Sequence, residues 1–195
     1  MRCLAAIVFP CLLVVLAGCA STPASRFYTL SAAATPAVPA SDLSVAVGPV
    51  SVPAVVDRPQ IVVRTSPNEV RLDEFNRWAS PLENNIARVV AANLVTMLGT
   101  PRVTVSSSAP GADADYRTVI QVQGFDSAPG EAATLDAVWT VSRTKDGKVQ
   151  TGRTTVREPS LESGYDALAA AHSRGIARLS RDIAEAVQAL ARSGS

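Results

Sequence analysis

Residues 116–123 read Tyr-Arg-Thr-Val-Ile-Gln-Val-Gln, and residues 135–142 read Leu-Asp-Ala-Val-Trp-Thr-Val-Ser. In both stretches a mainly apolar set of side chains alternates with a more polar set, which is typical of strands with one buried face. A third strand is expected at about 149–157, and Asp146-Gly147 before it is a good hairpin turn. The pattern predicts an antiparallel meander that covers a core on one side.

Two amphipathic helices are expected beside this meander. Ser80 and Pro81 suit the N-cap and first positions of a helix that carries an acidic residue at its third position and ends at Gly99. A longer helix is expected over about 164–191, with Ser163 as its N-cap. Apolar residues recur at three- and four-residue spacing in both segments. The predicted fold class is therefore α+β, an antiparallel or mixed sheet with two long helices packed on one face.

Shorter strands are expected elsewhere in the chain. Residues 27–30 look like a strand that pairs with the sheet, and residues 61–64 and 70–72 suit the two arms of a hairpin. Residues 45–56 also have strand-like order, but two prolines there favour an edge strand or a bulge over a central strand. A further short strand is expected around residues 103–105.

The N-terminus has the features of a lipoprotein signal. Arg2 precedes an apolar run over residues 4–17, which falls short of the roughly 20 residues that a membrane-spanning helix needs. Residues 16–19 follow directly and read Leu-Ala-Gly-Cys. They resemble the bacterial signal in which a peptidase cuts before the cysteine and the thiol then carries a diacylglycerol. We therefore expect residues 1–18 to be a signal peptide and Cys19 to be the lipidation site.

The rest of the chain divides into a tether and one domain. Residues 19–41 are rich in Ala, Ser, Thr and Pro, a composition that favours a flexible tether, interrupted by the short strand near 27–30. Residues 42–192 are expected to form a single α+β domain. Ala20 follows the cysteine where an Asp would favour inner-membrane retention, and this resembles the outer-membrane pattern. The expected location is the outer membrane, lipid-anchored and facing the periplasm.

Composition excludes several classes of function. Removal of residues 1–18 leaves 17 basic and 17 acidic side chains, a balance that argues against binding to nucleic acid. Cys3 and Cys11 fall in the removed segment, and His172 is the only histidine. Zinc sites and Cys-His catalysis are therefore not expected, and His172, on an apolar helix face, is interpreted as structural. We expect no catalytic residue, no metal ligand and no cofactor apart from the covalent lipid on Cys19.

A group of charged, polar and aromatic residues between positions 57 and 78 forms the second distinctive feature. Its members are Asp57, Arg58, Pro59, Gln60, Arg64, Arg77 and Trp78. Asp57 and Arg58 suit either a turn, with Asp57 accepting local backbone N–H bonds, or a surface on which Arg58 binds a partner's carboxylate or carbonyl groups. The same alternatives hold for Arg64 and Arg77. Trp78 is either a core residue or an exposed anchor for a partner.

The Asp-Arg-Pro-Gln-Ile-Val run, the later Arg-Trp-Ala, the Phe-Tyr-Thr-Leu segment and the N-terminal signal together resemble the ABC-type transport auxiliary lipoprotein family, which includes the paraquat-inducible PqiC-like lipoproteins. The resemblance covers about residues 19–192. Val55 and Ser80 depart from the family's pattern, where an aromatic and an acidic residue are expected. The resemblance implies a non-enzymatic outer-membrane component of an intermembrane transport system for lipids or other hydrophobic compounds. Its implied role is a docking or channel-end piece.

The implied partners are a periplasmic MCE-domain protein and inner-membrane transporter subunits, together with self-association into a homo-oligomer. An alternative is an accessory lipoprotein that assembles or activates a cell-wall or envelope complex. A hydrolase would need a carboxylate pair, for which Asp57, Asp73, Glu74 and Glu83 are available, but nothing in their spacing requires one. A lipid-binding module would need an apolar cavity, which the sequence does not distinguish from a core.

Overall fold

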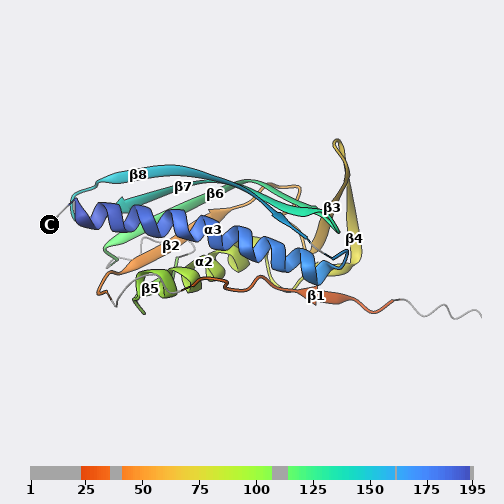
Figure 1. Cartoon of the computed structure of the whole chain (residues 1–195), viewed down its shortest axis with the longest axis horizontal. Coiled ribbons are helices and arrows are strands. Elements are labelled where there is room, and N and C mark those ends of the chain that lie inside the picture. The colour runs from red at the N-terminus through yellow and green to blue at the C-terminus, as the bar shows by residue number, and fades with distance from the viewer. Residues whose placement is uncertain (1–22, 36–40, 107–113, 161, 194–195) are drawn as a thin grey trace, which may run out of the picture.

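The computed structural model describes residues 23–35, 41–106, 114–160 and 162–193, which form two sheets and two helices (Figure 1). The five-stranded sheet has the spatial order β5 (Val103–Val105), β2 (Val45–Ser51), β6 (Tyr116–Ala128), β7 (Ala132–Arg143) and β8 (Val149–Pro159). The three-stranded sheet has the order β1 (Arg26–Tyr28), β4 (Glu69–Trp78) and β3 (Gln60–Ser66). The helices are α2 (Leu82–Leu98) and α3 (Tyr165–Arg192).

The predicted meander is confirmed. Strands β6, β7 and β8 pair antiparallel in sequence order, and the alternation read from residues 116–122 and 135–141 places its mainly apolar set in the core. Because β2 runs parallel to both β5 and β6, the whole sheet is mixed. The three-stranded sheet is a separate unit, so the β3–β4 hairpin and β1 do not extend the meander.

Strand β2 differs from the expected edge strand. Its first three residues are paired on both sides, with β5 and with β6, and only Val50 and Ser51 pair with β6 alone. The register shifts between Val47 and Val50, so the Gly48–Pro49 step forms the bulge that the prolines suggested. Gly48 has a φ of 119°, and a Cβ there would lie 2.1 Å from the carbonyl oxygen of Ser106. This position therefore requires glycine.

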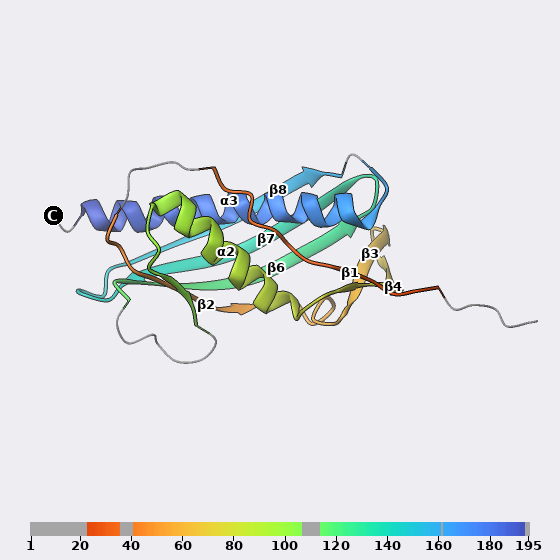
Figure 2. The same cartoon turned by 90° about the horizontal axis from the view of Figure 1, so that it is seen from below.

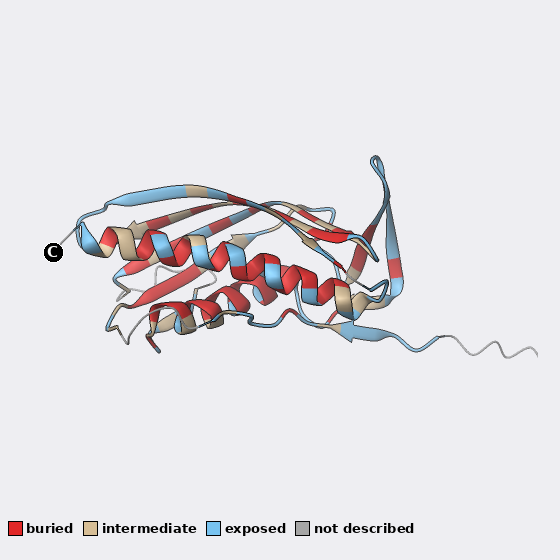
Figure 3. Cartoon of the chain, in the orientation of Figure 1, coloured by how far each residue is buried: buried red, intermediate tan, exposed pale blue. Residues whose placement is uncertain are grey.

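Both helices lie on the same face of the five-stranded sheet, as predicted (Figure 2). Their buried sides face each other and the sheet, while the outward side of α3 is exposed (Figure 3). Helix α3 packs mainly on β7 and β8, and α2 packs on β2 and β5. The core therefore occupies the layer between this sheet and the two helices.

The expected N-caps are wrong, although the helices themselves are correct. Helix α2 starts one residue later than predicted, with Pro81 at the N-cap, and α3 has Gly164 there. Ser80 and Ser163 each lie one residue before the observed N-cap, and neither helix has a side-chain hydrogen bond at its N-cap. The C-terminal end of α2 is as expected, because Gly99 adopts the left-handed conformation with a φ of 63°.

A segment that precedes β2 is fixed to the helices. Leu30 is 1% exposed, and the backbone N–H of Ser31 donates to Oγ of Ser173 on α3 at 3.1 Å. Asn93 on α2 accepts the backbone N–H groups of residues 33 and 34 with its Oδ1, at 3.0 and 3.1 Å. Its Nδ2 donates to Oγ of Ser180 at 3.1 Å. The tether predicted for residues 19–41 thus contains a stretch that packs with the domain.

Candidate functional site

The residues singled out between positions 57 and 78 come together at the three-stranded sheet. Gln60 and Arg77 are register partners on β3 and β4, and the backbone N–H of Trp78 donates to the carbonyl of Pro59 at 2.7 Å. A hollow of about 370 Å³ lies beside them. It is lined by Asp57, Arg58, Pro59, Trp78, Ala79, Ser80 and Pro81. Two segments far apart in the sequence thus build one surface.

The turn that carries Asp57 and Arg58 is held by backbone groups. The N–H groups of Val56 and Asp57 donate to the carbonyl of Pro53 at 3.0 and 3.1 Å, and the N–H of Arg58 donates to that of Val56 at 2.9 Å. Within the described part of the chain, the Asp57 side chain accepts none of the local N–H bonds that we expected. Both charged side chains are exposed, so Arg58 presents its guanidinium to solvent.

Arg64 and Arg77 are engaged within the domain. The guanidinium of Arg64 pairs with the carboxylate of Asp126 on β6 and donates to the carbonyl of Pro67 at 2.9 Å. Nε of Arg77 donates to the carbonyl of Glu74 at 3.0 Å, and its Nη2 lies 3.8 Å from that residue's carboxylate. These contacts favour the architectural interpretation for both arginines.

Trp78 is a core residue, 5% exposed. Its ring meets Phe125 and His172 edge-on, with centroids 6.1 and 6.2 Å apart, and the Phe125 and His172 rings stack at 3.8 Å. Nε2 of His172 lies 2.8 Å from Oγ of Ser127. Burial lowers the pKa of His172 to about 3, so its imidazole is neutral at physiological pH. This cluster joins α3, β4 and β6, and it supports the structural interpretation of the histidine.

Asp73 organises a bulge in β4 that the sequence did not reveal. Ile61 pairs with Asp73 and the preceding Gln60 with Arg77, so the intervening residues of β4 have no partner on β3. Oδ1 of Asp73 accepts the backbone N–H groups of Phe75 and Asn76 at 3.0 and 2.9 Å, the pattern of an Asx turn. An Asp followed by this turn inside an apparent strand is the signal that could have indicated the bulge.

The environment of Asp73 keeps it ionised. Burial would raise the pKa of its carboxyl, but hydrogen bonds from Tyr165 and Asn76 and from the backbone of the bulge lower it to about 2. The hydroxyl of Tyr165 donates to Oδ2 at 2.5 Å, and Tyr28 donates to Oδ1 of Asn76 at 2.9 Å. The network therefore ties β1, β4 and the start of α3 together. Asp73, one of the carboxylates that a hydrolase would use, has a structural role.

Exposed apolar side chains gather around the same sheet, a feature that sequence reasoning also missed. They are Phe27 on β1, Val70, Leu72 and Phe75 on β4, and Val55 in the turn before β3. Alternating apolar residues in a strand do not by themselves show whether their face is buried or exposed. The sequence therefore indicated that Val70 and Leu72 lie in a strand, but not that their side chains are exposed.

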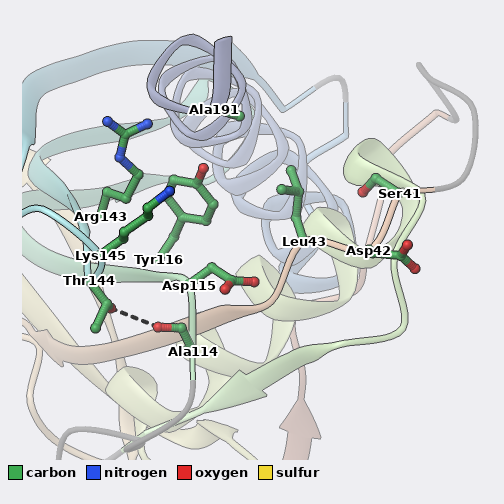
Figure 4. Close-up of a pocket in the computed structure, with 10 residues that line it drawn as sticks. All are labelled: Ser41, Asp42, Leu43, Ala114, Asp115, Tyr116, Arg143, Thr144, Lys145 and Ala191. Atoms are coloured by element: carbon green, nitrogen blue, oxygen red, sulfur yellow. Dashed lines mark hydrogen bonds between the residues drawn. The ribbon is translucent and has the colours of Figure 1, made fainter. Parts of the chain in front are cut away.

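A hollow of about 590 Å³ lies at the opposite end of the domain, and Figure 4 shows the residues that line it. Asp115 at its edge accepts hydrogen bonds from the backbone and hydroxyl groups of Ser44, and Thr144 donates to the carbonyl of Ala114 at 2.7 Å. Arg143 is bound to Asp146 and to the carbonyl of Leu190. Asp115, Arg143 and Thr144 are therefore engaged within the domain, and the described residues hold no group of three metal-ligating side chains.

No helix in the described ranges is long and apolar enough to cross a membrane.

Comparison with known proteins identifies relatives. No curated protein sequence matches the chain. Two crystal structures share its fold. One, of an uncharacterized protein, is 24% identical in sequence and has a TM-score of 0.69, and the match covers 85% of this chain and 99% of that one. The other, of a Xanthomonas campestris protein of the DUF330 family, is 23% identical and has a TM-score of 0.64, and the match covers 81% of this chain and 92% of that one. The model of one family, the ABC-type transport auxiliary lipoprotein component, matches residues 28–184. The chain therefore belongs to the family of ABC-type transport auxiliary lipoprotein components.

Proposed function

We propose that this protein is a non-enzymatic outer-membrane lipoprotein, anchored by a diacylglycerol on Cys19, that docks an intermembrane transport system. Its partners in this proposal are a periplasmic MCE-domain protein and inner-membrane transporter subunits, and its cargo is a lipid or another hydrophobic compound. The family match over residues 28–184 carries the proposal, because it makes the chain an auxiliary component of a transport system.

The geometry at the three-stranded sheet supports a docking role. Arg58 is exposed on a backbone-held turn beside a hollow that includes Pro59 and Pro81. A guanidinium on a rigid turn can donate two parallel hydrogen bonds to a carboxylate, and a rigid donor loses little entropy on binding. Arg64 and Arg77, which are already paired within the domain, are less suited to this role. We therefore assign the partner contact to Arg58.

The proposal is tested by isolating the protein from its own cell envelope. Tagged protein is extracted in a mild detergent, and the proteins that accompany it are identified by mass spectrometry. We expect an MCE-domain protein and inner-membrane transporter subunits. Recovery of wall-synthesis enzymes in their place would overturn the transport proposal and support the accessory alternative.

The contribution of Arg58 is measured in the same extract. We expect Arg58→Ala to recover about tenfold less of the partner, as a lost charged contact in an interface would produce. Because the side chain is exposed, the midpoint of thermal unfolding should stay unchanged. Arg178→Ala is the matched control, since Arg178 is exposed on the outer side of α3. Equal losses in both variants would show that Arg58 has no special part in docking.

A further inference from the structure

Exposed large apolar side chains are concentrated at the three-stranded sheet. Nine large apolar side chains are exposed among the described residues; four of them belong to this small sheet, and Val55 lies in the turn next to it. Phe27 is 64% exposed, the highest fraction among the nine. Soluble proteins rarely gather such residues without a surface to bind. We call Phe27, Val55, Val70, Leu72 and Phe75 the apolar end.

The described chain also begins at this end of the molecule. Both views show β1 beside β3 and β4, with the C-terminus of α3 far away at the opposite end (Figures 1 and 2). The pairing of β1 with the last three residues of β4 fixes this position. A chain that leaves β1 toward its N-terminus therefore departs from the apolar end and not from the end that carries the larger hollow.

Little chain separates β1 from the proposed anchor. Cys19 precedes Arg26, the first residue of β1, by seven positions. Even a fully extended chain of that length spans only about 25 Å. A lipid on Cys19 would therefore keep the apolar end within about that distance of the membrane surface, where a weak contact becomes effective because it is intramolecular.

We infer that the apolar end is a membrane-contact surface, which lies on the phospholipid headgroup and acyl boundary of the membrane that holds Cys19. Phe27 and Phe75 supply aromatic rings, which suit that boundary, and Val70 and Leu72 add apolar area on one face of β4. Arg26 is exposed beside Phe27, where a long cationic side chain can reach headgroups. This inference rests on the proposed lipid anchor and adds an orientation to it: the end with the larger hollow points into the periplasm.

The test uses tryptophan fluorescence on vesicles. The chain from Cys19 onward contains every described residue and has Cys19 as its only cysteine, so it can be coupled to a maleimide lipid at that position. Phe75→Trp is compared with Val149→Trp in vesicles of phosphatidylethanolamine and phosphatidylglycerol that carry doxyl-labelled lipid. Val149 is a matched control: it is exposed on β8, and the neighbouring Lys148 donates to the carbonyl of Ser193 at the end of α3.

The two native tryptophans are buried and are the same in both variants, so their quenching is measured in the parent protein and subtracted. We then expect the doxyl lipid to quench Phe75→Trp several-fold more strongly than Val149→Trp, because only the former lies at the membrane in this proposal. Equal quenching in the two variants would overturn the inference. A blue shift of Phe75→Trp that grows with protein concentration without vesicles would also overturn it, by showing that a second copy covers the patch. The coupled lipid takes the place of the natural one, so this experiment tests the membrane contact separately from the anchor. Mass spectrometry of the native protein tests the anchor, and an unmodified Cys19 there would refute the anchor alone.

Discussion

His172 shows how burial turns a titratable side chain into a structural one. Its ring stacks on Phe125 and meets Trp78 edge-on, and its Nε2 lies 2.8 Å from the hydroxyl oxygen of Ser127. A sequence with one histidine on an apolar helix face was sufficient to predict this role. The ring partners could not be predicted, because they come from β4 and β6, which meet α3 only in the folded structure.

The buried imidazole makes stability depend on pH in a defined window. The pKa of His172 falls from 6.5 to about 3 on folding, so the unfolded chain binds more protons between these values and stability falls as the pH falls below 6.5. We expect a loss of about 1.4 kcal/mol per pH unit in the free energy of unfolding. Urea denaturation from pH 7 to 4.5 measures it.

His172→Gln is the control for that measurement, because it keeps a polar group near Ser127 but cannot titrate. We expect a lower stability at pH 7 and a flat profile down to pH 4.5. The carboxylates with lowered pKa values, including Asp73 and Asp146, contribute only at lower pH, since their unfolded value is 3.8. A wild-type slope that persists in His172→Gln would assign the effect to another group.

Two glycines on facing elements should respond oppositely to alanine. A Cβ on Gly152 would lie 2.2 Å from Cζ2 of Trp139, whose ring covers this glycine and whose N–H donates to Thr154 at 3.1 Å. Gly152→Ala should therefore cost about 1–3 kcal/mol of unfolding free energy, as overpacking does. A Cβ on Gly175 in α3 would meet its nearest neighbours, Val156 and Leu135, at 3.6 and 3.7 Å, which is ordinary contact.

Gly175→Ala is therefore expected to stabilise the protein by about 0.5–1 kcal/mol, because alanine restricts the unfolded chain and favours the helix. Gly175 lies on the side of α3 that faces β7 and β8. It is buried, but the space around it admits a methyl group. Thermal denaturation of the two variants side by side provides the measurement, and shifts of the same sign would contradict the geometry.

In strand β4 the hairpin with β3 was predicted from the sequence, but the bulge was not. The hairpin with β3 follows from local turn chemistry, as does the meander from alternation within each strand. The Asx turn of Asp73 that forms the bulge is local, but the hydrogen bond that Tyr165 donates to Asp73 comes from 92 positions later in the sequence. Likewise, the prolines of β2 predicted an edge strand or a bulge, and the bulge is present. The pairing of β2 with both β5 and β6 depends on where the chain returns, which the local sequence does not show.

The bulge can be tested by removing the charge that holds it. Asp73→Asn replaces an acceptor of several hydrogen bonds with a group that has only one acceptor oxygen, and we expect a loss of about 1.5–3 kcal/mol in urea denaturation. Glu74→Gln is the control, because Glu74 is exposed and its carboxylate only approaches Arg77 at 3.8 Å. A loss in Glu74→Gln as large as that in Asp73→Asn would show that general charge, and not the Asx turn, governs this region.

The whole molecule has two unlike ends, and this polarity could not be read from the sequence. The three-stranded sheet carries the exposed apolar side chains and the start of the described chain, while the other end carries Arg143, Asp146 and the end of α3. The apolar residues were visible in the sequence, but their exposure depends on β1, β3 and β4 forming a sheet of their own. The short span from Cys19 to β1 keeps a lipid on Cys19 near the apolar end only because β1 belongs to that sheet.

If the short tether holds the apolar end against the membrane, lengthening it should weaken the contact. Insertion of a flexible Gly/Ser segment of about 20 residues between Ala24 and Ser25 adds a root-mean-square length of about 25 Å and dilutes the apolar end near the surface. We expect doxyl quenching of Phe75→Trp on Cys19-coupled vesicles to fall, while the same insertion after Ser195 leaves it unchanged. The domain itself should unfold at the same temperature in both proteins, since Ser25 precedes the first strand. Quenching that is insensitive to both insertions would show that the apolar end does not depend on the tether for its position.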